Sequence, residues 1–273
     1  ELGTIFNSGS ISNINGKFTN GTVSVTGSDV GGGAIYNTGK ISNITGEFTG
    51  NNGTNGGAIL NKGIIETIDG TFKNNVSENG GAIASIKNGT GHIGTIRGTF
   101  TGNSATNTGG AIAGGIGDGA IKNISGTFES NHANSAGAIY LTADKSPYST
   151  VISNSTFTNN YAGTVGAIAV EKISSLTINN TNFTNNYATN STSSGALWTS
   201  VNTTFNITEG FNMVMSGNYA DANDSKVYRG IIADSGASLV FAMKDASSVT
   251  MDDIIKGNSA FNMTISADST ESK

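Results

Sequence analysis

Short runs in which apolar and polar residues alternate recur along the whole chain. In the six-residue run that begins at Ile44, every second side chain is apolar or absent. Because the side chains of a strand point alternately to its two faces, Ile44, Gly46 and Phe48 are expected on one face, and the threonines and Glu47 on the other. None of these runs has the apolar spacing of a helix. The pattern predicts β-strands whose Ile and Phe side chains point into a core.

Two short motifs return in a fixed order and divide the chain into copies. The motif Gly-Ala-Ile, or Gly-Ala-Leu in its last copy, begins at Gly33, Gly57, Gly81, Gly110, Gly137, Gly166 and Gly195. The motif Phe-x-x-Asn begins at Phe48, Phe72, Phe100, Phe128, Phe157 and Phe183, and Met215 with Asn218 is a divergent copy. Equivalent residues of successive copies lie 24 to 32 residues apart, within the range of about 20 to 50 residues that is typical of solenoids.

The predicted fold is all-β, a right-handed parallel β-helix (β-solenoid) of about eight to ten coils, in which one copy forms one coil. Right-handedness follows from the strong preference of crossovers between parallel strands for that hand. Residues 1–220 carry the Gly-Gly-Ala-Ile and Phe-x-x-Asn repeats, and residues 221–273 are interpreted as degenerate C-terminal coils of the same solenoid.

Coils that stack at the strand spacing of about 4.8 Å place equivalent residues in columns. One internal column is expected to hold the phenylalanines of the Phe-x-x-Asn motif, and another Ile44, Ile68, Ile96 and Ile124. The Gly-Gly-Ala segment is predicted at a corner, where little space and a positive φ both favour glycine. The asparagine of Phe-x-x-Asn is predicted at a second corner, with its amides hydrogen-bonded along the stack.

Composition and charge narrow the functional classes. The chain has 39 glycines, no cysteine and a net charge of −5, and its 14 Lys and Arg residues are scattered. No basic surface for nucleic acid is therefore expected, and neither a disulfide nor a thiolate metal site can form. The two histidines, His92 and His132, lack the partner spacing of a zinc site. We expect no cofactor, no metal and no nucleic-acid partner, and no apolar run reaches the roughly 20 residues of a membrane-spanning helix.

Insertions collect after Gly-Ala-Ile in three consecutive copies, at residues 87–92, 114–119 and 144–148. Repeat insertions map to loops on one face, which is often the binding face, so these three are expected side by side. The alternative is loop drift without function. The candidate binding residues in these loops are Lys87, Asn88, His92, Asp118, Asp144, Lys145 and Tyr148.

An aromatic residue follows the motif asparagine in the later copies. These residues are His132, Tyr161, Tyr187 and Tyr219. Stacked in successive coils, they are expected to form a surface ladder that offers a platform to sugar rings or to a partner protein. The alternative is that the stack only stabilises the corner.

The paired Gly-Gly-Ala-Ile and Phe-x-x-Asn motifs resemble those of the chlamydial-type polymorphic membrane proteins, over roughly residues 30–220. The chain departs from that pattern at Ala136, Val165 and Ser194, which replace the first glycine, and in having no cysteine. The resemblance implies an autotransporter passenger: a β-helix at the cell surface or outer membrane, or secreted, that acts as an adhesin in virulence. It further implies a host-cell surface protein or glycan as partner, self-association or filament formation, and contact with the membrane only through a C-terminal β-barrel that this sequence does not include.

The sequence also has features of two other functional classes. A β-helix carbohydrate-active enzyme needs converging carboxylates, and the densest pairs are Asp221 with Asp224 and Asp252 with Asp253. Because the remaining carboxylates are dispersed, we expect no catalytic residues and no enzyme. Threonines flank the Phe motif as in ice-binding solenoids, but Glu47, Lys73 and Glu129 interrupt their columns. Ordinary strand propensity explains them better.

Overall fold

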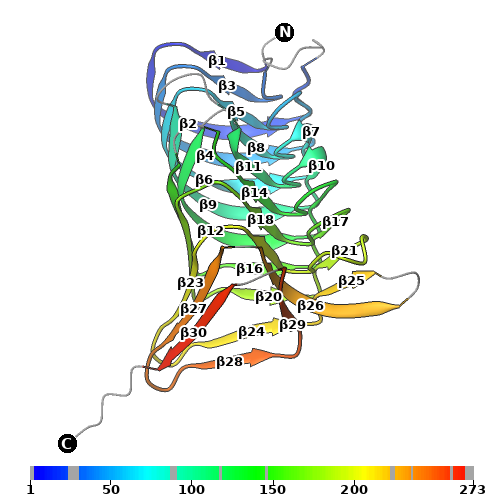
Figure 1. Ribbon diagram of the computed structural model, residues 1–273. Helices are drawn as coiled ribbons and strands as arrows, with labels where there is room; N and C mark the ends of the chain where they lie inside the picture. The colour runs from blue at the N-terminus through cyan, green and yellow to red at the C-terminus, as the bar shows by residue number, and fades with distance from the viewer. Residues whose placement is uncertain are drawn as a thin grey trace, which may run out of the picture.

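The computed structural model is a β-solenoid of about nine turns, in which strands from successive coils lie one above the other (Figure 1). It describes residues 3–23, 31–86, 91–116, 119–144, 147–221, 225–234, 236–258 and 261–267. All regular structure in these ranges is β-strand, and every strand pair is parallel except β25 with β26. The predicted all-β parallel β-helix is therefore confirmed.

The Gly-Ala-Ile motifs lead into the first sheet, sheet A. Its strands are β1 (Ile5–Asn7), β3 (Ile35–Asn37), β5 (Ile59–Asn61), β8 (Ile83–Ile86), β11 (Ile112–Ile116), β14 (Ile139–Leu141), β18 (Ile168–Val170), β22 (Leu197–Thr199), β26 (Lys226–Ala233) and β29 (Ile254–Gly257). The motif isoleucine begins each strand from β3 to β18 and is fully buried in each of them.

The Phe-x-x-Asn motifs lie at the ends of strands in the second sheet, sheet B. Its strands are β2 (Ser10–Thr19), β4 (Lys40–Thr49), β6 (Ile64–Lys73), β9 (His92–Thr101), β12 (Ala120–Glu129), β15 (Ser149–Ser153), β16 (Thr156–Thr158), β19 (Ser175–Asn179), β20 (Asn182–Thr184), β23 (Thr203–Ile207), β24 (Asn212–Ser216), β27 (Ser238–Met243), β28 (Ser248–Met251) and β30 (Asn262–Ala267). Strand β12 pairs with both β15 and β16, so from this coil on each long strand is replaced by two short ones. Asn154 and Asn180 turn the chain between the halves with φ of 49° and 46°.

A third, narrower sheet, sheet C, follows the motif asparagines. Its strands are β7 (Val76–Asn79), β10 (Ser104–Thr108), β13 (His132–Ala133), β17 (Tyr161–Ala162), β21 (Tyr187–Ala188) and β25 (Tyr219–Asp221). Strand β25 joins sheet A through an antiparallel pairing with β26. Strands β26 to β30 extend sheets A and B beyond the last clear repeat, and Phe241 stacks on Phe205 at 4.6 Å between ring centroids.

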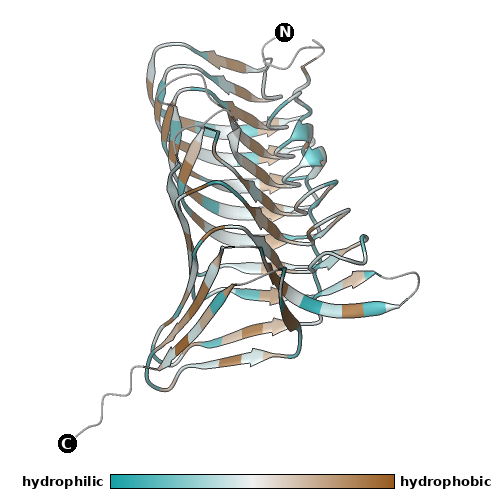
Figure 2. Cartoon of the chain, viewed as in Figure 1, coloured by the Kyte–Doolittle hydropathy of each residue, from teal (hydrophilic) through white to brown (hydrophobic). Residues whose placement is uncertain are grey.

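The two predicted apolar columns fill the interior. Phenylalanines from Phe18 to Phe183 stack at 4.7 to 5.1 Å between ring centroids, with planes within 10° of parallel. The column continues as Met215 and Met251. Ile44, Ile68, Ile96 and Ile124 pair in register as expected. Figure 2 shows these apolar bands repeating at the same place from coil to coil.

The motif asparagines form a buried column of amides. These residues, here the Asn column, are Asn51, Asn75, Asn103, Asn131, Asn160, Asn186 and Asn218, and all are fully buried. Each Nδ2 up to that of Asn186 donates to the Oδ1 of the next coil's asparagine at 2.9 Å. Each also donates to the carbonyl oxygen of the preceding coil's Phe at 2.8 to 3.1 Å. The predicted amide stack is confirmed, and it satisfies polar groups that no water reaches.

A second, unexpected amide column lies at the end of sheet A. Asn7 donates to Asn37 at 2.8 Å and Asn37 to Asn61 at 2.9 Å between Nδ2 and Oδ1. Each begins a tight Asn-x-Gly turn into sheet B. The next coil has Ser85 at this position, and its buried Oγ has no hydrogen-bond partner among the described residues. The column therefore ends where the inserted loops begin.

The Gly-Gly-Ala corner needs glycine for both of the predicted reasons. The first glycine has a φ of 64° at Gly56, 62° at Gly80 and 63° at Gly109, and Ala136 keeps a φ of 60° at the equivalent place. The second glycine lies against the next coil: a Cβ on Gly110 would stand 2.0 Å from the carbonyl oxygen of Gly137. Of the two positions, the first is Ala136, Val165 and Ser194 in the last three copies, whereas the second is glycine in every copy.

Candidate functional site

The predicted aromatic ladder lies on the outside of sheet C. His132, Tyr161, Tyr187 and Tyr219 pair in register, and their ring centroids are 4.9, 5.2 and 5.2 Å apart with planes within 7° of parallel. All four side chains are partly exposed. The stack predicted from the sequence therefore forms.

Both ends of the aromatic ladder are held by neighbouring side chains. The Oγ of Ser104 and the Nε2 of His132 form a hydrogen bond of 2.8 Å, and burial lowers the pKa of His132. At the other end, the Lys226 ammonium stands 4.3 Å from the ring centroid of Tyr219. Because each ring covers the face of the next, a ligand could reach only ring edges and hydroxyls along the ladder. The geometry favours the corner-stabilising role, with the hydroxyl edge left for contacts.

The described ends of the three inserted loops lie at one corner, between sheets A and B. The loops connect β8 to β9, β11 to β12 and β14 to β15, which are neighbours in both sheets, so the prediction that they adjoin is confirmed for their described ends. Asp144 is exposed and His92 partly exposed. Tyr148 instead packs against the core. Lys87, Asn88, Asp118 and Lys145 lie outside the described residues.

A second surface, not predicted from the sequence, runs along the outside of sheet A. The outward residues in successive coils are Phe6, Tyr36, Leu60, Ala84, Ala113, Tyr140, Ala169, Trp198 and Ile232. Nearly all are apolar, and some form clusters separate from the interior core. Ala136 and Val165, from the connections between sheets C and A, pack over Ala169.

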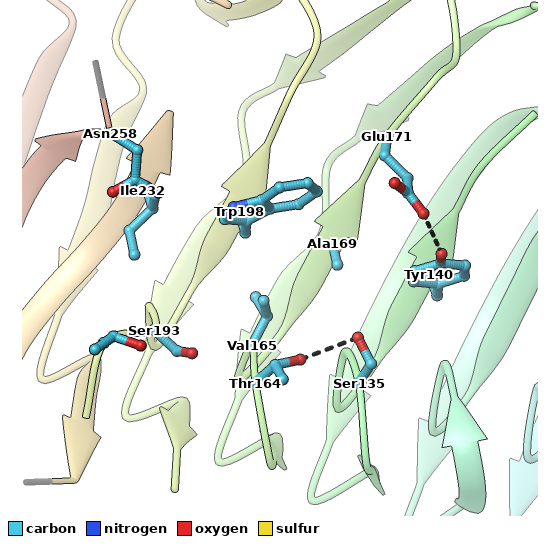
Figure 3. Close-up of a pocket in the computed structure, with 11 residues that line it drawn as sticks. Ser135, Tyr140, Thr164, Val165, Ala169, Glu171, Ser193, Trp198, Ile232 and Asn258 are labelled. Carbon is cyan, nitrogen blue, oxygen red and sulfur yellow. Dashed lines mark hydrogen bonds between the residues drawn. The ribbon is translucent and has the colours of Figure 1, made fainter. Parts of the chain in front are cut away.

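This cover is incomplete between Tyr140 and Ile232, where a hollow of about 360 Å³ remains. We call it the sheet A hollow (Figure 3). It is lined by Ser135, Tyr140, Thr164, Val165, Ala169, Glu171, Thr192, Ser193, Trp198, Ile232 and Asn258. Figure 3 shows Tyr140 and Trp198 on either side of Ala169, with hydroxyl side chains along the opposite edge. An apolar floor with a few polar groups at its rim is typical of ligand sites.

The polar groups of the sheet A hollow are held in place by hydrogen bonds. The Tyr140 hydroxyl donates to Glu171 Oε1 at 2.5 Å, and burial, together with this carboxylate, raises the pKa of Tyr140 well above its usual range. Thr164 Oγ1 donates to Ser135 Oγ at 3.0 Å. Arg229 fixes the neighbouring wall by donating to the carbonyl oxygen of Ser193 at 2.8 Å. These contacts preorganise the rim.

The sequence held one signal for this surface. Strand alternation after Gly-Ala-Ile places the next residue outward, and that residue is Tyr, Leu, Ala, Ala, Tyr, Ala and Trp in the seven motif copies. An outward position that stays apolar is a sign of a covered or binding face. Because its residue type changes, the position does not appear as a motif.

The acidic pair Asp252 and Asp253, on which the enzyme alternative partly rested, has a structural role at the end of the Asn column. Asp253 accepts from Asn218 Nδ2 at 2.6 Å and from the Asn218 backbone N–H at 3.1 Å. Asp252 accepts from Ser216 Oγ at 2.7 Å and Gly217 N–H at 3.1 Å. The Asp253 carboxylate accepts the hydrogen bond of the last amide in the column. Because it has no N–H of its own to donate, the column ends there. Of the other pair, Asp224 lies outside the described residues.

Asp253 should make the stability of this end depend on pH. Burial raises its pKa to about 6, against hydrogen bonds from Asn218 that lower it. A folded-state pKa above the unfolded value means that stability is highest below about pH 4 and falls as the pH rises to about 6, by on the order of 3 kcal/mol. In Asp253→Asn, which keeps the acceptor oxygen, we expect this fall to vanish. Urea unfolding between pH 4 and 7.5 measures it, and an unchanged slope in the variant would contradict the assignment.

Among the described residues, no group of three or more His, Asp or Glu side chains is placed to hold a metal ion. The same residues include no helix long and apolar enough to cross a membrane.

Part of the chain matches a known family of repeats. Residues 69–86 match the family model described as the Chlamydia polymorphic membrane protein (Chlamydia_PMP) repeat. They include Phe72-x-x-Asn75 and Gly81-Ala82-Ile83 and run from the end of β6 through β7 into β8. Neither a curated protein nor a solved structure gives a significant match.

Proposed function

We propose that this chain, which carries repeats of the Chlamydia polymorphic membrane protein type on a β-solenoid, is the adhesive passenger of a surface-displayed autotransporter. The proposed partners are a host-cell surface protein or glycan and further copies of the chain. The location is the cell surface, on the extracellular side of an outer membrane, or the medium after release. The role requires no catalytic step.

The observation that carries this proposal is the match of the repeat together with a lateral surface that has polar and aromatic features in successive coils. The solenoid core is continuous, so the side surfaces are held in fixed positions. On one side the hydroxyl edges of the aromatic ladder recur about every 5 Å, and on another the sheet A hollow opens. A rigid rod of this kind can present several weak contacts at once, which raises avidity.

Adhesion predicts saturable binding of the purified chain to host cells. Fluorescently labelled chain is added to cell monolayers over a wide concentration range, and unlabelled chain should displace it. Sedimentation velocity over the same range tests association between copies. Binding that stays linear and unsaturated, together with a single monomer species at every concentration, would rule out the adhesive role. Chain unfolded by urea and diluted onto cells at the same residual urea is the control for non-specific adsorption.

A further inference from the structure

The sheet A hollow lies where one small side chain separates two large aromatic ones in the outward row of sheet A. Tyr140, Ala169 and Trp198 are register partners in adjacent strands β14, β18 and β22. A single methyl group therefore stands between two aromatic side chains on the outer face. Next to them Ile232 is buried and closes the row toward the C-terminal coils.

The gap has aromatic sides and a polar rim from different parts of the chain. Ser135, Thr164, Thr192 and Ser193 bring hydroxyls from the connections that precede sheet A, and Glu171 brings a carboxylate from the residue after β18. The Tyr140–Glu171 and Thr164–Ser135 hydrogen bonds leave acceptor lone pairs on Glu171 and Ser135 for a ligand. The hollow thus combines aromatic surface with several hydroxyl-binding groups over a short distance.

Charge limits the ligand class. Glu171 is the one charged residue among the described residues that line the hollow. A carboxylate repels anionic ligands and accepts strong hydrogen bonds from hydroxyl groups. Its charge is partly balanced by the Lys172 ammonium at 3.9 Å and by the hydrogen bond from Tyr140. This balance, with a rim of neutral hydroxyls, favours an uncharged polyhydroxyl ligand over a cation.

We infer that the sheet A hollow binds a neutral oligosaccharide. The C–H face of a pyranose ring packs on Trp198 or Tyr140, because those C–H bonds meet the electron-rich face of an aromatic ring. The sugar hydroxyls donate to Glu171 and exchange hydrogen bonds with the serine and threonine rim. The inference rests on the proposed adhesive function and names the ligand class for one of its surfaces.

The first variant to test this is Ala169→Phe, which fills the gap with an aromatic side chain between Tyr140 and Trp198. Position 169 lies on the outer face of sheet A between Tyr140 and Trp198, so the larger ring does not enter the interior core, but it must displace Ala136 and Val165, which pack against Ala169. The second variant, Trp198→Ala, removes the indole that forms one aromatic wall of the hollow. Tyr36→Ala is the matched control. Tyr36 holds the same outward position on sheet A as Tyr140, but it lies four coils away from it and outside the hollow. Circular dichroism and melting temperature establish that each variant folds.

Binding is measured on a glycan array holding neutral, sialylated and sulfated oligosaccharides, with affinities of hits determined by calorimetry. We expect the unmodified chain to bind neutral glycans. Ala169→Phe and Trp198→Ala should each lose at least about tenfold in affinity, and Tyr36→Ala should bind as the unmodified chain does. Glu171→Gln, which keeps an oxygen for the Tyr140 hydroxyl, should weaken neutral glycans by a smaller factor.

Two results would overturn the inference: glycan binding that Ala169→Phe leaves unchanged, or binding restricted to sialylated or sulfated glycans. Saturable binding to cells without any glycan hit would also overturn it, while leaving the proposed adhesion in place. Absence of both, together with a single monomer species in sedimentation, would instead remove the adhesive function itself, so the two failures can be told apart.

Discussion

Replacing Asn131 with alanine should destabilise the solenoid by about 3 to 6 kcal/mol, because four buried polar groups lose a partner. Asn131 Nδ2 donates to the carbonyl oxygen of Phe100 and to Oδ1 of Asn160, both at 2.9 Å. Its own Oδ1 accepts from the side chain of Asn103 at 2.9 Å and from the Asn103 backbone N–H at 3.0 Å. Alanine removes the acceptor of the Asn103 backbone N–H and the donor to the Phe100 carbonyl oxygen. It also removes one of the two partners of Asn103 Nδ2, which keeps the Phe72 carbonyl oxygen, and one of the two donors to Asn160 Oδ1, all at a position that water does not reach.

The size of this effect follows from the position of the residue in the middle of the Asn column. In a solenoid each coil contacts only its neighbours, so a weak interface in the centre separates two blocks of coils. Unfolding should then lose cooperativity, with the coils on the two sides of residue 131 opening independently. Urea unfolding followed by the fluorescence of the single tryptophan, Trp198, reports the C-terminal block. Hydrogen exchange of the backbone amides of Asn103 and Asn131 reports the broken interface.

Asn43→Ala is the control for Asn131→Ala. Asn43 also hydrogen-bonds to an equivalent asparagine, Asn13, at 3.1 Å, but both side chains are exposed. Its removal should change the unfolding free energy by no more than about 0.5 kcal/mol, since water replaces the lost partner. Equal losses in the two variants would show that burial of the Asn column is not what stabilises it.

The interior of the solenoid could be predicted from the sequence because its columns repeat one residue type at a nearly constant interval. Phe48 and Asn51 return in each copy with the same separation, and stacking of parallel strands converts that periodicity directly into columns. The Asn7, Asn37 and Asn61 column was missed because it has only three rungs before Ser85 replaces it. Its Asn-x-Gly spacing was nevertheless present in the sequence as a tight-turn signal.

The candidate binding surfaces were harder to predict, for physical reasons that differ between them. The aromatic ladder repeats a residue type, so it was found. The sheet A hollow depends on Ala169 being small between Tyr140 and Trp198, a contrast of neighbours that lie 29 residues apart in sequence in each direction. The sequence did not reveal that Asp253 ends the Asn column. Asp253 follows Met251 by two residues, whereas each motif asparagine follows its Phe or Met by three. Where one strand ends a residue earlier, a motif search fails although the stacking persists.

A second large effect is expected from Gly110→Ala, at the corner that the repeated Gly-Gly-Ala segment forms. The added Cβ would stand 2.0 Å from the carbonyl oxygen of Gly137 and 2.6 Å from the backbone nitrogen and oxygen of His132. All three atoms belong to backbone, so no change of rotamer can relieve the overlap. The coils must move apart, which strains the hydrogen bonds of Ala111 and Ile112 to the Ala138 carbonyl oxygen, both 2.9 Å long. We expect a loss of at least about 3 kcal/mol.

Gly9→Ala separates this steric cost from the general effect of replacing glycine. A Cβ on Gly9 would meet no atom within 4 Å. Alanine there only restricts the unfolded chain, so stability should stay within about 1 kcal/mol of the unmodified protein or rise slightly. Thermal unfolding of both variants provides the comparison, with hydrogen exchange of the Ala111 and Ile112 amides to locate the damage. If Gly110→Ala and Gly9→Ala have the same melting temperature, the corner tolerates a side chain. Close contact between coils would then not be the reason that the second glycine is kept in every copy.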